Sequence, residues 1–286
     1  MNNLNGLGTA LITPFQADGS VDYEALKRLL DTQLTGAVDY IVVLGTTGEA
    51  ATMNADEKRE VRQFIVNNVN GRLPLVLGVG GNNTAAVCAE LEMMKEELVR
   101  DYAAILSVCP YYNKPNQEGL YQHFCKVAEA SPVPVLLYNV PGRTGVNLLP
   151  ETVMRIYGAH PDKIVGIKEA SGNLEQIKHL IELANSKFLV ISGDDGFAAE
   201  VMEAGGAGLI SVASNAFPED FYKIVHEKDQ VRQAKYENMV KLLFAEGNPV
   251  GIKAVLAQKG IIQNNLRLPL VPASKELRLA ISELAN

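Results

Sequence analysis

The 286-residue sequence contains no tryptophan, only three cysteines and only four histidines. The cysteines are odd in number and show no C-x-x-C spacing, so a disulfide framework or a structural zinc site is not expected. The histidines are scattered without H-x-x-x-H spacing, which is typical of surface or helix histidines rather than of metal ligands. We therefore expect no bound metal.

Long apolar runs and basic runs are also missing. No apolar stretch approaches the roughly 18 residues that a membrane-spanning helix needs, and the N-terminal residues do not have the pattern of an export signal. The net charge is −7 and the basic residues do not cluster, so neither nucleic acid nor an anionic membrane surface is expected as a partner. We expect a cytoplasmic protein whose partners are small molecules or further copies of the chain.

Short apolar runs rich in valine and isoleucine recur along the chain, separated by longer amphipathic stretches. Nearly continuous apolar character is typical of strands that are buried on both faces of a parallel sheet. The intervening stretches have helical periodicity, and one of them starts with Asn54 followed by Glu57, the pattern of a capping box. The eight apolar runs begin at Thr9, Tyr40, Leu73, Tyr102, Val133, Lys163, Lys187 and Ala207.

Eight alternating strands and helices predict an α/β fold, a closed (β/α)8 TIM barrel. A doubly wound open sheet is the alternative, but it usually has fewer strands and concentrates its ligand chemistry at one switch point. Here polar, reactive residues follow most of the apolar runs, as they do at the carboxyl-terminal face of a barrel. We expect the barrel to span residues 1–220 and a C-terminal helical extension to span residues 221–286.

The sixth apolar run, IVGIKEASGN, leads directly into Lys168. An apolar ring of strands disfavours a charged ammonium, so a lysine at this place is favoured as the neutral amine. A neutral amine attacks carbonyl groups and forms a Schiff base, which acts as an electron sink. For a strand-end lysine considered alone, an ion pair with Glu169 or a side chain that reaches water is the commoner arrangement. The neighbouring residues decide between these interpretations.

Two further side chains follow the fifth apolar run. Tyr138 ends that run, so in a barrel it neighbours Lys168, and its hydroxyl could carry protons to and from an imine and its substrate. The alternative is a core tyrosine whose hydroxyl binds a backbone carbonyl. Arg143 lies in the PGRTG turn just beyond, and its guanidinium is suited to a carboxylate. A solvated loop arginine is the alternative for Arg143.

The second apolar run ends in the turn GTTGE. Its glycines, Gly45 and Gly48, permit a tight turn, which leaves the hydroxyl and N–H groups of Thr46 and Thr47 available for a small carboxylate or a proton relay. Other glycine-rich segments carry weaker signals: GVGGNN lacks the third glycine of a dinucleotide fingerprint, and SGDDG offers two adjacent carboxylates without further metal ligands. A P-loop is absent from the sequence.

Taken together, these motifs resemble the pyruvate-dependent class I aldolases, the superfamily that includes dihydrodipicolinate synthase and N-acetylneuraminate lyase. The resemblance runs through most of the chain, from GTALITPF to NNLRLPLVP, and depends on the GTTGE turn, Tyr112, Tyr138 and Lys168. Arg143 in YNVPGRTG favours the dihydrodipicolinate synthase branch, because the sugar-acid lyases usually lack this arginine.

The resemblance implies a condensation of pyruvate with L-aspartate 4-semialdehyde that yields 4-hydroxy-tetrahydrodipicolinate, a step of diaminopimelate and lysine biosynthesis that needs no cofactor. It implies that Lys168 forms the Schiff base with pyruvate and that Arg143 binds the carboxylate of the aldehyde. The pyruvate carboxylate would be held by Thr47 and the backbone of Ile210, and Gly193 would be a further substrate-binding position.

The resemblance also implies a proton relay that consists of Thr46, Tyr138 and Tyr112, with Tyr112 contributed by a neighbouring subunit. The active unit would then be at least a dimer. A homotetramer built as a dimer of dimers is the form expected from the family.

One departure from the family concerns regulation. Members inhibited by lysine have a polar pocket, which Asn82 and Tyr111 match. Four other positions, where such members place serine, histidine, histidine and glutamate, hold Ala50, Ala55, Lys58 and Ala86. Loss of an anionic partner and gain of a cation disfavour a dibasic ligand. We expect lysine to inhibit weakly or not at all.

Two other functions remain open from the sequence. The chain could be an aldolase for a sugar acid or another 2-oxo acid, which the choice of aldehyde would distinguish. It could also be a catalytically idle barrel that binds a ligand, although such a protein would need neither a nucleophile nor its proton relay.

Overall fold

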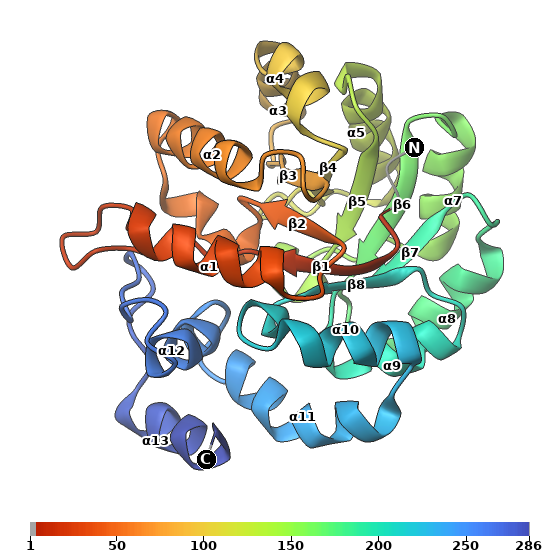
Figure 1. Ribbon diagram of the computed structural model, residues 1–286. Coiled ribbons are helices and arrows are strands. Elements are labelled where there is room, and N and C mark those ends of the chain that lie inside the picture. The colour runs from red at the N-terminus through yellow and green to blue at the C-terminus, as the bar shows by residue number, and fades with distance from the viewer. Residues whose placement is uncertain (1–3, 286) are drawn as a thin grey trace. The chain divides into compact units, whose positions relative to one another are not determined.

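The computed structural model describes residues 4–285, in which eight strands form a closed barrel in sequence order (Figure 1). The TIM barrel expected from the sequence is therefore confirmed. Each strand overlaps one of the eight apolar runs. The strands are β1 (Gly6–Ala10), β2 (Tyr40–Val43), β3 (Leu75–Gly78), β4 (Ala104–Val108), β5 (Val135–Asn139), β6 (Ile164–Glu169), β7 (Leu189–Ser192) and β8 (Gly208–Ser211).

Helices alternate with the strands and continue after the last one. Those between the strands are α1 (Tyr23–Thr35), α2 (Ala55–Val69), α3 (Thr84–Met93), α4 (Lys95–Asp101), α5 (Gln117–Ala130), α6 (Pro141–Thr144), α7 (Pro150–Ala159), α8 (Leu174–Leu183) and α9 (Ala198–Glu203). Those after β8 are α10 (Pro218–Glu227), α11 (Gln230–Phe244), α12 (Val250–Gln258) and α13 (Lys275–Ala285).

The chain groups into two compact units. The first comprises Pro74–Ile210 with a short N-terminal segment, and the second comprises Gly6–Leu73 together with the part of the chain from Ser211 onward. The division expected from the sequence, between residues 220 and 221, stays a prediction.

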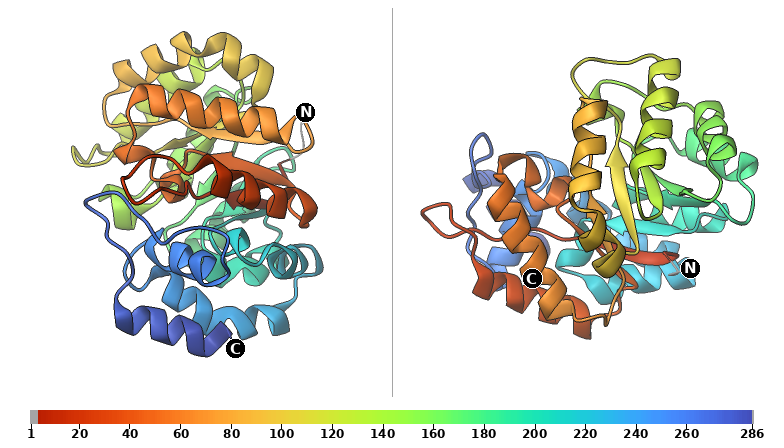
Figure 2. Two further views of the ribbon diagram at one scale, coloured as in Figure 1. Left: turned by 60° about the vertical axis from the view of Figure 1, so that its left-hand side comes forward. Right: turned by 90° about the horizontal axis from the view of Figure 1, so that it is seen from above.

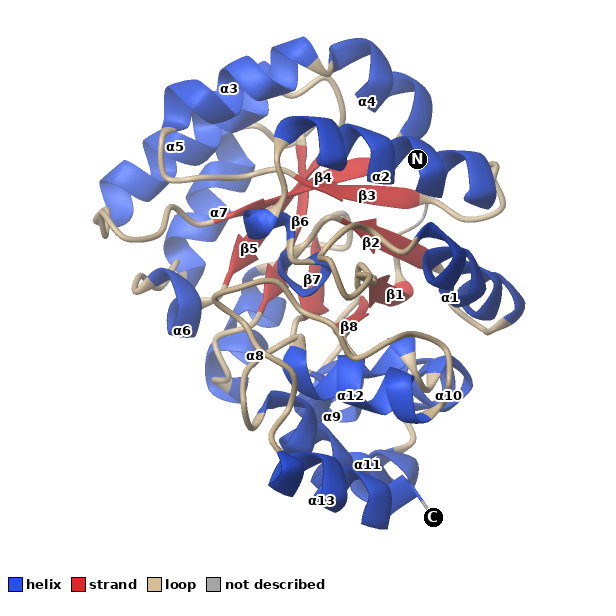
Figure 3. Ribbon diagram, turned by 90° about the vertical axis from the view of Figure 1, so that its left-hand side faces the viewer, coloured by secondary structure: helices blue, strands red, loops and turns tan. Residues whose placement is uncertain are grey.

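The first unit contains the parallel strands β3 to β8 with the helices that connect them. Helix α5 packs between α3 and α7, and α8 packs beside α7 and against β7 (Figure 3). Strands β5 and β6 are buried along nearly their whole length, as expected for strands covered on both faces. At Gly166 in β6 an added Cβ would lie 2.3 Å from the carbonyl oxygen of Leu189, so only glycine fits at this point of the sheet.

In its described residues, the second unit combines β1 and β2 with the α-helices α1, α2 and α10 to α13. The predicted capping box at the start of α2 is confirmed, because the Asn54 side chain accepts from the N–H of Glu57 and the Glu57 side chain accepts from the N–H of Asn54. In the C-terminal part, coloured blue in Figure 2, α11 packs against α12 and α13. Buried hydrogen bonds join this part to β1, as between Thr9 Oγ1 and Ser214 Oγ at 2.8 Å.

Within residues 4–285, no helix is both long enough and apolar enough to span a bilayer.

Candidate active site

The best candidate nucleophile lies at the carboxyl end of β6. Strands β5 and β6 are parallel neighbours, and their register places Tyr138 directly opposite Lys168. Both side chains are buried, and Lys168 Nζ lies 4.5 Å from the centroid of the Tyr138 ring. The sequence prediction that these two residues neighbour each other is thus correct. The amine faces an aromatic surface instead of bulk water.

The commoner arrangement for a strand-end lysine, here an ion pair between Lys168 and Glu169, does not occur. Successive strand residues point to opposite faces, and the Glu169 carboxylate accepts hydrogen bonds from Asn139 Nδ2 at 2.9 Å, Ser171 N at 2.7 Å and Gln176 Nε2 at 3.2 Å. Among residues 4–285, no carboxylate forms an ion pair with Lys168. The Lys168 amine therefore has no anionic side-chain partner in this part of the chain.

The Glu169 side chain belongs to a buried polar network on the other face of β5 and β6. Burial raises the pKa of Glu169, while the hydrogen bonds from Asn139, Ser171 and Gln176 oppose that rise. Burial also raises the pKa of the nearby Cys109 thiol, with a smaller contribution from the Glu169 charge. A buried thiol of this kind is a poor nucleophile.

Gly193 and Ile210 belong to the next two βα units of the same compact unit, at β7 and β8. Gly193 follows β7 and donates its N–H to the Glu169 carbonyl oxygen at 2.7 Å. A Cβ at Gly193 would lie 2.9 Å from Lys168 Cε and 2.6 Å from the Ala170 Cβ, so glycine leaves room for the lysine side chain. Ile210 lies in β8 and is fully buried. The structure therefore brings Gly193 next to Lys168.

Tyr112 lies in the loop between β4 and α5, and its side chain is 89% exposed. Its backbone is in the left-handed region at φ +74°, which is uncommon for a residue with a bulky side chain. The next residue anchors the loop, because Asn113 Nδ2 donates to the Asn82 carbonyl oxygen at 2.9 Å. Tyr112 therefore has little contact with the rest of its own unit.

Arg143 lies in the one-turn helix α6 that follows β5, and its side chain is exposed. The turn closes when Arg143 N donates to the Val140 carbonyl oxygen and Gly145 takes a left-handed φ of +74°. An added Cβ on Gly145 would lie 3.1 Å from Lys114 Cε, so the Arg143 turn and the Tyr112 loop are neighbours. An exposed guanidinium at this place is accessible to a carboxylate in solution.

The GTTGE turn lies in the second unit, where β2 ends. Thr46 and Thr47 form a single 3₁₀ turn, η1 (Thr46–Gly48), between two residues with left-handed backbone, Leu44 and Glu49. Thr46 is exposed, whereas Thr47 is buried and its Oγ1 accepts from Asn248 Nδ2 at 2.9 Å. Thr13 Oγ1 donates to the Gly48 carbonyl oxygen at 2.8 Å.

Glu49, the last residue of the GTTGE turn, has a buried side chain that is held from the C-terminal part of the chain. Its Oε1 pairs with Lys253 Nζ, and its Oε2 accepts from the backbone N–H of Arg267 at 3.2 Å. Lys253 is fully buried above the Phe15 ring, with its Nζ 4.2 Å from the ring centroid. Burial lowers the pKa of Lys253 to about 8, and the Glu49 charge opposes that change.

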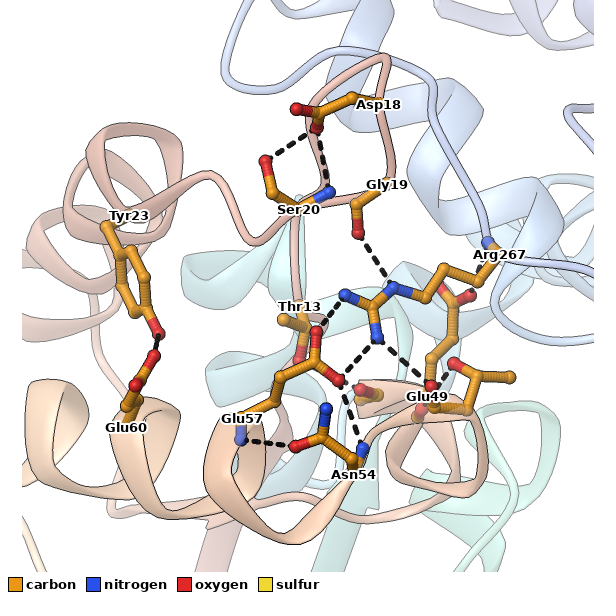
Figure 4. A network of polar contacts seen from close by, with 12 residues as sticks. Thr13, Asp18, Gly19, Ser20, Tyr23, Glu49, Asn54, Glu57, Glu60 and Arg267 are labelled. Atoms are coloured by element: carbon orange, nitrogen blue, oxygen red, sulfur yellow. Dashed lines mark hydrogen bonds and ion pairs between the residues drawn. The ribbon is translucent and has the colours of Figure 1, made fainter.

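The Arg267 side chain extends this cluster to the start of α2, as Figure 4 shows. Its guanidinium donates to both carboxylate oxygens of Glu57 and to the carbonyl oxygens of Gly19 at 2.8 Å and Thr52 at 3.0 Å. The hydrogen bond from Arg267 is the main reason that the pKa of Glu57 is lowered. The capping carboxylate of α2 is therefore also an ion-pair partner. We call Lys253, Glu49, Arg267 and Glu57 the turn cluster.

Sequence reasoning overlooked Asn248, Lys253 and Arg267, although two of them carried a signal. Lys253 is a charged residue inside VGIKAVL, a helical stretch whose residues are all buried, and a buried lysine requires a partner. Arg267 stands in the NNLRLPLVP segment among apolar and amide residues. Asn248 carried no such signal, because an asparagine before a proline is common in loops.

Among residues 4–285, no group of three or more histidine, cysteine, aspartate or glutamate side chains is placed to hold a metal ion.

Comparisons with known proteins agree on one family. The model of the dihydrodipicolinate synthetase family matches residues 3–286. The 4-hydroxy-tetrahydrodipicolinate synthase of Parabacteroides distasonis is 48% identical over 277 residues, which cover 94% of this chain and 92% of that protein.

Solved structures give the same result. The dihydrodipicolinate synthase of Acinetobacter baumannii, solved in complex with pyruvate, has a TM-score of 0.93 and 38% identity, and the match covers 99% of this chain and 98% of that one. A monomeric variant of dihydrodipicolinate synthase has a TM-score of 0.92 and 40% identity, with 98% of this chain and 95% of that chain covered.

Proposed function

The chain belongs to the dihydrodipicolinate synthetase family, and from this premise we propose which of its residues carry the reaction. The activity is that of a 4-hydroxy-tetrahydrodipicolinate synthase. Pyruvate and L-aspartate 4-semialdehyde condense through a lysine Schiff base, in diaminopimelate and lysine biosynthesis. The observation that carries the assignment of residues is the buried Lys168 at the end of β6, opposite Tyr138 and without an ion-pair partner in residues 4–285.

Lys168 is the nucleophile. Its neutral amine attacks the keto carbon of pyruvate, water leaves, and an imine forms between Nζ and that carbon. Loss of a proton from the methyl group gives the enamine, whose carbon then attacks the aldehyde carbon of the second substrate. The amine of that substrate finally attacks the imine carbon and displaces Lys168 as the ring closes. The lysine is thereby returned to its starting state.

The proton transfers are assigned to Tyr138, Thr46 and Tyr112. Support for Tyr138 comes from its position next to Lys168, which puts a hydroxyl-bearing ring beside the reacting nitrogen. Thr46 is supported by its exposed place in the turn after β2, and Tyr112 by its exposed hydroxyl. We assign Tyr112 to the active site of a second copy of the chain, because it is exposed in its own copy.

The substrate-binding roles fall to four residues. Thr47 and the backbone of Ile210 bind the pyruvate carboxylate, and Gly193 leaves space for the substrate beside Lys168. Arg143 binds the carboxylate of L-aspartate 4-semialdehyde with its exposed guanidinium, which presents a planar fork of donors. The protein acts in the cytoplasm as a homotetramer, a dimer of dimers. It needs no metal or organic cofactor.

The assignment of Lys168 is tested by trapping the imine. The protein is incubated with pyruvate and borohydride, with and without L-aspartate 4-semialdehyde, and the modified peptide is identified by mass spectrometry. A reduced pyruvyl adduct on Lys168 that forms with pyruvate alone, and that decreases when the aldehyde permits turnover, is the expected result.

Two variants serve as controls for the trapping experiment. Lys168→Ala should abolish the adduct. Lys163→Ala, which removes a half-buried lysine just before the same strand, should leave it unchanged. An adduct on another lysine, or none, would overturn the assignment of the nucleophile.

A further inference from the structure

The Thr47 hydroxyl is held by a residue from a distant part of the chain. Asn248 lies in the loop between α11 and α12, and its Nδ2 donates to Thr47 Oγ1 at 2.9 Å. Both side chains are buried, with 2% of Thr47 and 7% of Asn248 exposed. A hydrogen bond that is shielded from water in this way holds its direction, because no solvent competes for the donor or the acceptor.

The direction of this bond determines what Thr47 can do. A threonine hydroxyl has one proton to donate and two lone pairs to accept with. When the amide of Asn248 occupies a lone pair, the hydroxyl proton must point elsewhere. Among residues 4–285 the Thr47 hydroxyl makes no second hydrogen bond, so no group in this part of the chain takes up its proton.

The backbone around Thr47 is fixed from two directions, by Thr13 near the N-terminus and by residues of the C-terminal part. Gly48 is held through its carbonyl oxygen by Thr13, and Glu49 is held by Lys253 and by Arg267 N. Asn248 and Lys253 come from one short segment and contact residues two positions apart in the turn. The turn is therefore attached at consecutive residues, and the hydroxyl of Thr47 has little freedom to turn.

From this arrangement we infer that Asn248 is a positioning residue for pyruvate. Its amide donates to Thr47 Oγ1 and thereby directs the hydroxyl proton of Thr47 toward the pyruvate carboxylate. Asn248 acts only through Thr47 and does not touch the substrate. The inference rests on the proposed role of Thr47 in binding pyruvate. It adds that Asn248 makes the Thr47 hydroxyl the donor in its hydrogen bond with the pyruvate carboxylate.

The decisive variant is Asn248→Asp, which conserves shape but cannot donate. The new carboxylate would accept the Thr47 proton and take it away from the substrate, so the KM for pyruvate should rise about tenfold or more, the size expected for a lost hydrogen bond to a charged group. The maximal rate at saturating pyruvate should change much less. If the Asn248 oxygen instead accepted from Thr47, Asn248→Asp would preserve the bond and the KM, which would overturn the inference.

A double-mutant cycle with Thr47→Val distinguishes an action of Asn248 through Thr47 from a direct effect of charge or structure. The new negative charge of Asn248→Asp persists in the Thr47→Val background, but the hydroxyl is gone, so the rise in KM should be several-fold smaller there. An equal rise in both backgrounds would show that Asn248 acts by charge or structure rather than through Thr47, and would overturn the inference.

Two further measurements keep the outcomes distinct. Asn248→Ala should also raise the KM for pyruvate, and thermal unfolding of each variant identifies any that fails to fold. If Thr47→Val by itself leaves the KM for pyruvate unchanged, the proposed role of Thr47 is wrong. If Thr47→Val raises the KM and Asn248→Asp does not, the role of Thr47 stands and only the inference about Asn248 fails.

Discussion

Two loops that supply hydroxyl groups to the proposed relay are held in opposite ways. Both contain residues with left-handed backbone, Leu44 and Glu49 around the GTTGE turn and Tyr112 and Lys114 in the loop after β4. Such conformations cost of order 1–3 kcal/mol each unless the surroundings enforce them. The GTTGE turn is enforced by buried hydrogen bonds and ion pairs, whereas the side chain of Tyr112 is 89% exposed.

The difference indicates which contacts stabilise each loop. The GTTGE turn is completed by the chain itself, through the turn cluster and Asn248. The Tyr112 loop has a fixed backbone, but its tyrosine has little contact with its own unit, which is what a residue directed to a second copy requires. The four predictions below test this contrast.

The largest expected effect is the loss of stability in Lys253→Met. This change leaves the Glu49 carboxylate buried without its cation, and breaking a buried pair from one side costs about 3–5 kcal/mol. The double variant with Glu49→Gln should recover most of that loss, because no unpaired charge remains. Urea unfolding at one fixed protein concentration measures both effects.

A matched control for Lys253→Met is Lys241→Met. Lys241 pairs with Glu237 on the exposed face of α11, and such surface pairs contribute at most about 1 kcal/mol. If Lys253→Met cost no more than Lys241→Met, the GTTGE turn would not depend on the turn cluster.

The second prediction concerns Tyr112→Phe, which should leave the free energy of unfolding within about 0.5 kcal/mol, as for other exposed substitutions. Its catalytic rate should fall about a hundredfold, the lower limit for a general acid or base. Mixing Tyr112→Phe chains with Lys168→Ala chains should restore part of the activity, since mixed assemblies combine an intact tyrosine with an intact lysine. If verified exchange of subunits restored none, Tyr112 would not act across an interface.

The third prediction is a pH effect at Arg267. The pKa of Glu57 is lowered in the folded chain, chiefly by the Arg267 hydrogen bond, so the unfolded chain binds the proton first as the pH falls below the usual value of 4.5. The stability that this group contributes is present above that pH and is lost as the pH falls through the folded pKa. Arg267→Gln should remove this part of the acid sensitivity and cost about 1.5–3 kcal/mol at pH 7.

The pH effect is measured by urea unfolding of the wild type and Arg267→Gln at a series of pH values from 7 down to 3.5. The quantity compared is the difference between their unfolding midpoints at each pH. Equal slopes for wild type and Arg267→Gln would contradict the assignment of Arg267 as the cause of the lowered pKa of Glu57.

The smallest effect is expected from added lysine. Ala50, Ala55 and Lys58 lie between the GTTGE turn and the first turns of α2, and Ala86 lies in the first turn of α3. None of these side chains offers the anion that a dibasic ligand requires. Millimolar lysine should leave the steady-state rate nearly unchanged, whereas inhibition at micromolar concentrations would contradict this expectation.

The sequence was sufficient for the barrel because each strand had its own apolar run, and helical periodicity was visible in several of the stretches between them. It was also sufficient for the pairing of Lys168 with Tyr138, since consecutive parallel strands end at the same edge and the register places both residues there. The capping box of α2 was predicted for a similar reason, because it depends on residues only three positions apart.

The supports of the GTTGE turn could not be predicted in the same way. Asn248 and Thr47 are 201 residues apart, and Arg267 and Glu49 are 218 residues apart, so no local pattern relates them. The ion pair of Glu57 with Arg267 could not be predicted either, because a capping glutamate has the same sequence pattern whether or not an arginine binds it. Side-chain pairing at such distances becomes visible only in the folded chain.

The late position of these supports has a consequence for synthesis on the ribosome. A nascent chain that has just passed Ser211 contains every strand of the barrel together with Lys168 and Tyr138, yet it still lacks Asn248, Lys253 and Arg267. Elongation proceeds from the N-terminus, so the GTTGE turn gains all of its supports only after the chain has emerged beyond Arg267. Chains that end before Asn248 would thus carry the proposed nucleophile, while the turn proposed to hold the pyruvate carboxylate would lack its supports.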